Sequence, residues 1–227
     1  YGPPKPKHTR EQVKLARAWM CRNFYDVRTF GAVMSTGDDA GQVRGPVQLT
    51  FSRSLDPIVP MDVSITRMAV TEPKEAEKGR EGEESKAKSE PPLQTMGRKS
   101  LIPYGLYACQ GFVSANYADD TRFTDADLAL FWEAMKGMFD DDHSAARGLM
   151  AARGLKVFKH VGTDSDVAQR VRQARLGCAP AHKLIEVGAV VDVKKREGVA
   201  VPRRFEDYEV VVHKEKVPKG VELVEMI

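Results

Sequence analysis

The chain has 227 residues, a formal net charge of +3 and 42% hydrophobic residues, which is enough to form a buried core. So small a charge neither requires nor excludes a nucleic-acid partner, because local clustering rather than the total defines a phosphate-binding surface. No apolar run reaches the roughly 18 residues of a membrane span, and the opening residues lack a signal-peptide pattern. Cys21, Cys109 and Cys178 lack the spacing of a zinc site or disulfide framework, so we expect a reduced, cytoplasmic protein.

Charge is unevenly distributed along the chain. Eight acidic residues between Asp119 and Asp142 accompany only Arg122 and Lys136, so the remaining segments are correspondingly basic. This pattern predicts one basic face and one acidic face, and it favours an anionic partner.

The first third of the chain predicts one helix followed by two strands. Thr9 and Gln12 have the spacing of a capping box, and apolar residues then recur every three or four positions, which indicates a helix over residues 10–24. Residues 25–34 and 43–54 are rich in Val, Phe and Thr and are expected to be strands. In the second strand, apolar side chains alternate with polar ones that a ligand could use: Gln48, Thr50 and Ser52.

The middle of the chain predicts a long hairpin with a charged insert. Residues 63–70 and 101–114 are expected to be strands, and residues 71–92 between them contain hardly any apolar side chain. Such a segment buries too little surface to offset the entropy of ordering, so we expect the insert to be mobile.

The second half predicts a helix and several strands. Thr124 and Asp127 cap a helix near residues 125–139, whose core-facing stripe contains Leu128, Phe131, Trp132, Met135, Met138 and Phe139. A strand at 154–161, a polar or helical passage to 175 and strands at 184–193 and 205–212 follow. The order predicts an α+β fold: a split β-α-β-β-α-β unit whose first strand would precede Tyr1.

Short segments spread over nearly the whole chain resemble the backbone subunits of type I-C CRISPR effector complexes. In chain order they are DVRTFGAVM (26–34), GQVRGPVQL (41–49), SITR (64–67), MGRK (96–99), PYGLY (103–107), SAARGL (144–149), FKH (158–160) and APAHKL (179–184).

The resemblance implies a ferredoxin-like, RNA-recognition-type palm with a thumb hairpin and web or finger insertions. On this basis residues 1–227 form one palm domain: residues 8–60 and 115–227 supply the palm, and 61–114 the thumb and web. Members assemble side by side along a CRISPR guide RNA, contact target DNA and other subunits of the complex, and catalyse no reaction. The family's opening strand and its Gly- and Asn-rich loop are not represented in this sequence. No cofactor is implied.

Arginine, lysine and histidine residues within or near these segments are the candidate RNA contacts. Arg44 precedes Gly45, where the backbone could approach a phosphate while the guanidinium binds its oxygens; a plain surface charge is the alternative. Met68 and Met96 are candidates for the wedge of the thumb, or for core packing. The full candidate set is Arg28, Gln42, Arg44, Arg53, Arg67, Met68, Met96, Arg98, Lys99, Lys159, His160, His182 and Lys183.

Two other functions remain open. Related proteins of the same superfamily cleave CRISPR RNA without metal, and His160 beside Lys159 or His182 beside Lys183 could deprotonate a ribose hydroxyl and stabilise the phosphorane. A purely structural, self-associating protein is the third hypothesis. We expect no catalytic metal, and the motifs of nucleotide hydrolysis, dinucleotide binding and serine hydrolysis are absent from the sequence.

Overall fold

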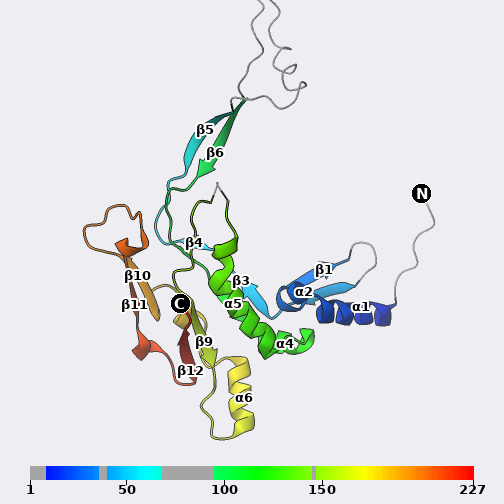
Figure 1. Ribbon diagram of the computed structural model, residues 1–227. Coiled ribbons are helices and arrows are strands. Elements are labelled where there is room, and N and C mark those ends of the chain that lie inside the picture. Colours follow the sequence, from blue (N-terminus) through cyan, green and yellow to red (C-terminus); the bar gives the residue numbers. More distant parts are fainter. Residues whose placement is uncertain (1–8, 36–39, 68–94, 145–146) are drawn as a thin grey trace, which may run out of the picture.

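The computed structural model describes residues 9–35, 40–67, 95–144 and 147–227 (Figure 1). The chain is 35% helical and 28% strand, which confirms the α+β class. Within the described ranges, the strands form six antiparallel pairs rather than one continuous sheet. The ferredoxin-like arrangement therefore stays a prediction from the order of the elements.

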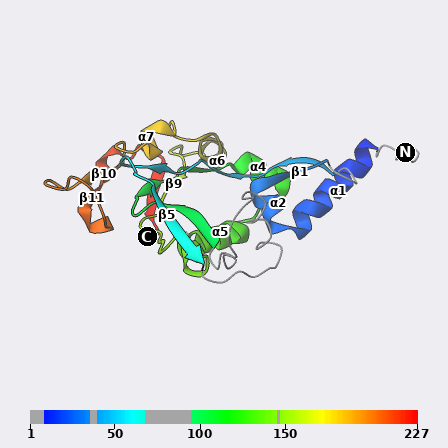
Figure 2. The same cartoon turned by 90° about the horizontal axis from the view of Figure 1, so that it is seen from above.

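An N-terminal arm extends to one side of the molecule (Figures 1 and 2). It consists of α1 (Arg10–Asn23), α2 (Tyr25–Phe30), β1 (Gly31–Met34) and β2 (Gly41–Arg44), and the two strands pair. The predicted capping box of α1 is confirmed: the Thr9 amide donates to Gln12 Oε1 at 2.8 Å, and the Gln12 amide donates to Thr9 Oγ1 at 3.3 Å.

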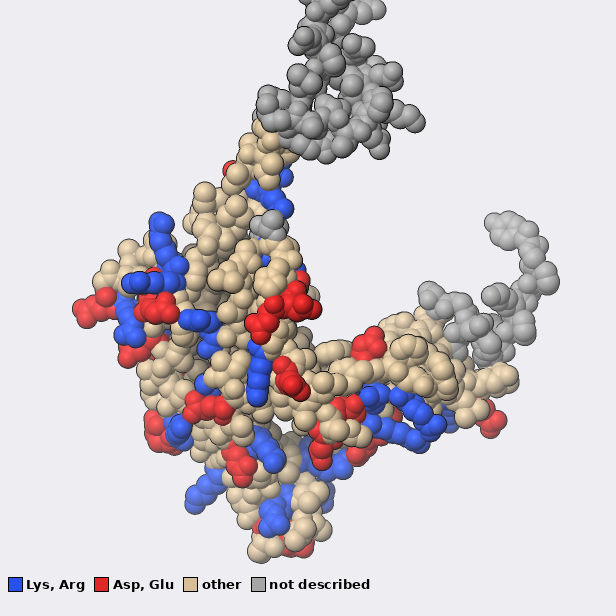
Figure 3. All heavy atoms as spheres, viewed as in Figure 1, with Lys and Arg blue, Asp and Glu red and all other residues tan. Residues whose placement is uncertain are grey.

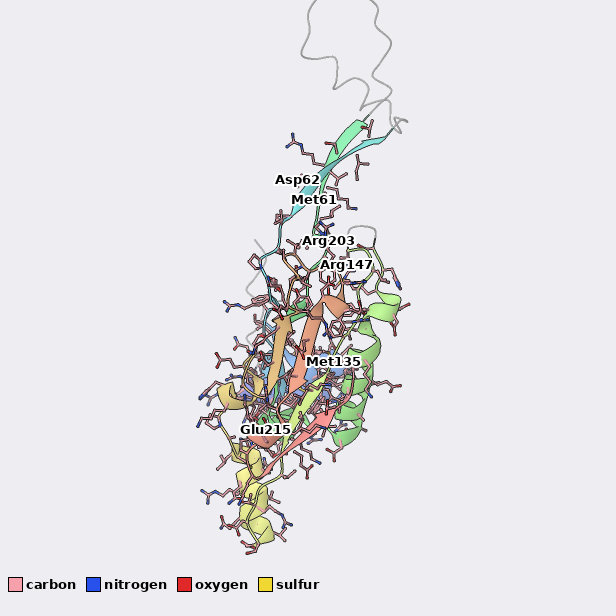
Figure 4. All side chains as sticks on the ribbon, turned by 90° about the vertical axis from the view of Figure 1, so that its left-hand side faces the viewer. Met61, Asp62, Met135, Arg147, Arg203 and Glu215 are labelled. Atoms are coloured by element: carbon pink, nitrogen blue, oxygen red, sulfur yellow. The ribbon has the colours of Figure 1, made fainter. Side chains whose placement is uncertain are left out.

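The middle of the chain forms short strands, a projecting hairpin and two helices. The strands are β3 (Val47–Leu49) paired with β8 (Gly111–Val113), and β4 (Arg53–Ser54) paired with β7 (Tyr107–Ala108). Between them, β5 (Met61–Arg67) and β6 (Thr95–Leu101) form the projecting hairpin, with Met61 and Asp62 near its base (Figure 4). Then follow α4 (Ala115–Thr121) and α5 (Asp125–Asp141).

The C-terminal third forms two strand pairs and two helices around a small core. Its elements are β9 (Lys156–His160), α6 (Val167–Leu176), α7 (His182–Ile185), β10 (Val191–Lys195), β11 (Tyr208–Val212) and β12 (Val221–Glu225), with β9 paired to β12 and β10 to β11. Short 3₁₀ turns occupy Phe205–Asp207 and Lys214–Lys216. Leu184, Val190 and Val221 form the buried centre.

The predicted packing of α5 is confirmed at its centre. Phe131 is buried and meets the Phe30 ring edge-on, with 6.1 Å between ring centroids. Leu128, Trp132 and Met135 are half-buried beside it, whereas Met138 is exposed. Phe131 therefore anchors α5 to the end of α2.

Several predicted strands are wrong in part. Residues 25–30 form α2, where Arg28 donates to the Cys21 and Arg22 carbonyls of α1 and to the Asp127 carboxylate of α5; bonds to other elements override the local β propensity. Residues 184–185 belong to α7. Residues 43–54 and 101–114 are each divided among short strands, the first at Gly45 and Pro46. The insert 71–92 lies outside the described residues.

Gly45 is closed against backbone, not open to a ligand. It is buried, and a Cβ at this position would lie 2.3 Å from the Thr29 carbonyl oxygen and 2.4 Å from the Gly31 nitrogen. The expectation that Gly45 lets a phosphate approach is therefore wrong: the glycine lets β2 turn away directly over the end of α2.

Gly45→Ala should thus destabilise the arm, because backbone atoms must move to admit the methyl group. We expect the free energy of unfolding to fall by about 2 kcal/mol or more. Gly97→Ala in β6 is the matched control, since its Cβ would meet no atom within 4 Å. Urea denaturation of both variants provides the measurement, and equal stability of the two would contradict the packing described for Gly45.

Candidate nucleic-acid interface

The outer face of the β1–β2 pair carries mixed apolar, amide and cationic side chains. Gln42 and Arg44 are two residues apart on β2, so both point to the same face, and Val33 of β1 lies opposite Gln42 in the register. All three are exposed, Val33 by 70%. The other face packs on α1, where Val13 lies beside Gly41. We call the solvent-facing side of this pair the outer face.

A shallow hollow of about 490 Å³ lies on this outer face. Its lining residues come from the end of α2 and from β1, β2 and β3: Phe30, Gly31, Ala32, Val33, Gln42, Val43, Arg44 and Gln48. The Gln48 side chain donates to the carbonyl oxygens of Gly45 at 3.1 Å and Phe30 at 3.4 Å, which fixes its position at the rim. The hollow therefore offers an apolar floor with amide and guanidinium groups at its edge.

Arg44 is held by an aromatic ring and not by an acid. Its guanidinium carbon lies 4.7 Å from the centroid of the Tyr117 ring on α4. Ser114 caps α4 by accepting a hydrogen bond from the Tyr117 amide. In the described part of the chain no carboxylate pairs with Arg44, so its charge is oriented and remains free for an anion.

Arg28 is in a different situation from Arg44. It forms two bonds to the Asp127 carboxylate, at 2.6 and 3.1 Å, and its side chain is only 17% exposed. Bonding to Arg28, assisted by Thr124, lowers the pKa of Asp127 to about 2. Since Arg28 also donates to two backbone carbonyls, it braces the arm against α5, and we remove it from the candidate surface.

The hairpin does not present its candidate residues on one side. Arg98 lies opposite Ser64 and Lys99 opposite Val63, and consecutive strand residues point to opposite faces. The expectation of one groove containing both residues is therefore wrong. Met61, Val63 and Ile65 form an exposed apolar stripe on the Lys99 side. Arg67 and Met96 occupy the far end of the pair, where their side chains are not described, and Met68 lies outside the described residues.

The remaining candidates are spread over other elements. Arg53 is exposed on β4, Lys159 is exposed on β9, and His182 and Lys183 are exposed on α7. His160 is half-buried, and its Nδ1 accepts a hydrogen bond from the Cys178 amide at 2.9 Å. This bond places the ring proton of a neutral His160 on Nε2 and gives the side chain a structural role in joining β9 to the segment after α6.

The sequence singled out Gln42 and Arg44, which lie together on the outer face, but not the neighbouring residues Phe30 and Tyr117. Phe30 was assigned to a strand, and Tyr117 belongs to α4, a seven-residue helix absent from the predicted elements. The alternation of apolar and polar residues around Gln48 was the one sequence pattern that pointed to the rim of the hollow, because it predicted a polar strand face that a ligand could use.

Charges on the visible face are mixed, not segregated. Figure 3 shows Lys and Arg interspersed with Asp and Glu over the body, with acidic side chains over α5 and basic ones over α6. Single basic and acidic faces, as predicted from the sequence, are not seen on this side. The charge distribution on this side therefore does not by itself mark one anion-binding face.

The described residues contain no group of three or more His, Cys, Asp or Glu side chains that could hold a metal ion. Among the helices of the described ranges, none combines the length and the apolar character required to cross a bilayer.

Comparison with known proteins gives a family. A family model described as CRISPR-associated protein Cas7 matches residues 4–213, which is most of the chain. A search of curated proteins gave no match. Given the extent of the family match, the chain belongs to the Cas7 family, the RNA-binding backbone subunits of CRISPR-Cas complexes.

Proposed function

We propose that this chain is the non-catalytic backbone subunit of a type I-C effector complex, which polymerises along guide RNA and presents it for pairing with target DNA. The observation that carries the proposal is the outer face of β1–β2, where Arg44 is stacked on Tyr117 beside Val33 and Gln42. The segments that resemble type I-C backbone subunits support the type, and the family supports guide RNA and other complex subunits as partners.

This surface suits RNA of any sequence. A guide-binding protein must accept every spacer, so its contacts should go to phosphates, sugars and base faces rather than base edges. Arg44 supplies the phosphate contact, and the exposed Val33 and Phe30 side chains supply apolar surface for a base or ribose. We assign residues 8–60 and 115–227 to the palm of the subunit and residues 61–114 to its thumb and web.

We infer that neither His160 nor His182 cleaves RNA. His160 Nδ1 already accepts the Cys178 amide, and its ring is half-buried in the C-terminal core region. His182 is exposed on α7 without a described hydrogen-bond partner that would orient it as a base. We place the complex in the cytoplasm, where the three free cysteines stay reduced.

Arg44→Ala should weaken RNA binding mainly through charge. Each phosphate neutralised on a single strand contributes about −0.7 to the slope of log affinity against log salt, so the variant should show a slope flatter by about 0.7. The loss should be nearly equal for all guide sequences, because phosphate contacts carry no base information. A salt titration of guide RNA binding measures both effects.

Arg153→Ala is the matched control for Arg44→Ala. Arg153 also stacks on an aromatic ring, with its guanidinium 4.4 Å from the Phe205 centroid, but it is paired with Glu206 at 3.2 Å. Its charge is already countered, so the salt slope should stay at the wild-type value. If the two variants behave alike, or if Arg44→Ala affects only some sequences, the outer face does not bind phosphate as proposed.

The absence of turnover has its own test. Purified protein incubated with CRISPR precursor RNA should leave it intact, with or without divalent metal. If the protein cleaves the RNA and His160→Ala or His182→Ala abolishes the cleavage, the chain is the endoribonuclease of the alternative hypothesis and not a non-catalytic backbone subunit. Filaments that form without RNA and contain no RNA would favour the third hypothesis, a purely structural, self-associating protein.

A further inference from the structure

The side of α5 that faces away from its core stripe carries a second hollow, of about 630 Å³. Ala134 and Gly137 form its floor, and Leu130 and Met138, both about half exposed, form its apolar edges. No atom other than Asp140 Oδ2 would lie near a Cβ added at Gly137, so nothing described covers this floor. The α5 hollow is therefore an unpartnered apolar helix face with room for side chains.

The rim of the α5 hollow is acidic, and two of its carboxylates are unpaired. Glu133, Asp141 and Asp142 line it. Asp142 is bonded to Arg147, whereas Glu133 and Asp141 have no ion-pair partner in the part of the chain that the structure describes. Uncompensated carboxylates beside an apolar floor favour an occupant that is apolar in the centre and cationic at its edges.

Helix α6 has the complementary surface. It contains no acidic residue, all but two of its residues are exposed, and Val167 and Val171, one turn apart, are 60% and 51% exposed. Arg170 and Arg172 flank the two valines, and neither has a carboxylate partner among the described residues. Arg175 differs from them, since it bonds Asn116 and Asp119 and thereby fastens α6 to α4.

The two surfaces lie in different parts of the molecule. In Figure 1, α6 projects from the lower end, away from the C-terminal half of α5, and Figure 3 shows basic side chains over α6 and acidic ones over α5. Because the hollow and the helix are different patches, joining them between copies gives a head-to-tail contact that can repeat from one copy to the next.

We propose that α6 of one copy docks in the α5 hollow of the next copy. Val167 and Val171 fill the apolar floor at Ala134 and Gly137, while Arg170 and Arg172 meet Glu133 and Asp141. This inference rests on the proposed function and deepens it, because it assigns the protein contact that joins neighbouring subunits on the guide.

Charge reversal tests the contact. Glu133→Lys and Arg172→Glu should each weaken subunit-to-subunit cooperativity on a long guide RNA by about tenfold, because each places like charges together. The double variant Glu133→Lys/Arg172→Glu restores opposite charges and should recover most of that loss. Mass photometry of the loaded RNA counts the copies bound at each protein concentration.

Glu197→Lys is the matched control. Glu197 is exposed in the β10–β11 connection and has no described ion-pair partner, so the substitution makes the same charge change away from both surfaces. Cooperativity should stay within about twofold of wild type. Equal loss in Glu197→Lys, or no recovery in the double variant, would overturn the proposed contact.

Two further measurements separate this contact from RNA binding itself. Affinity for an RNA that holds one subunit should be unchanged within about twofold in all four variants. A loss in the two variants that carry Arg172→Glu, and not in the others, would mean that α6 binds RNA, against the proposal. If the wild type binds no RNA, the proposed function fails. The contact is then tested by sedimentation of concentrated RNA-free protein, which measures self-association directly. Self-association equal in wild type, Glu133→Lys and Arg172→Glu would reject it.

Discussion

The bonded pair of Arg28 and Asp127 positions the surface on which the proposed function depends. The pair joins α2 to the first turn of α5, and Asp127 at the same time accepts bonds from Thr124 that cap α5. Because β1 follows α2 without a loop, fixing α2 also fixes the strand pair that carries Arg44. Gly45 then brings β2 directly over the end of α2, so the pair has one packed face and one free face.

Three arginines show how neighbouring groups decide the role of a charge. Arg28 is half-buried and bonded to a carboxylate and two carbonyls, so it contributes to folding. Arg153 stacks on Phe205 but shares its charge with Glu206. Arg44 stacks on Tyr117 and has no described acid, which leaves an oriented, uncompensated cation. The same contrast separates Arg175, bonded to Asp119, from Arg170 and Arg172 on α6.

Local signals predicted the elements that local interactions stabilise. The capping boxes at Thr9 and Thr124 located α1 and α5. The strand expected at 63–70 overlaps β5, but its partner was expected at 101–114, whereas β6 spans Thr95–Leu101 and meets that range only at Leu101. Helix α2 was missed because its stabilising bonds reach other elements, and the bonding of Arg28 to Asp127 could not be predicted because the two residues lie 99 positions apart. The opposite directions of Arg98 and Lys99 follow from strand geometry alone, so that error was avoidable. Tyr117 could be found only once α4 was placed beside β2.

We propose that this Cas7-family chain holds guide RNA without cutting it. Its most direct test is to express the protein with a CRISPR array, purify it, record the ratio of absorbance at 260 and 280 nm, and size the bound RNA. We expect a ratio dominated by nucleic acid, with guide RNA protected from added nuclease and not cleaved by the protein. Protein that self-associates free of RNA, or that carries only fragments missing from its His160→Ala variant, would contradict it.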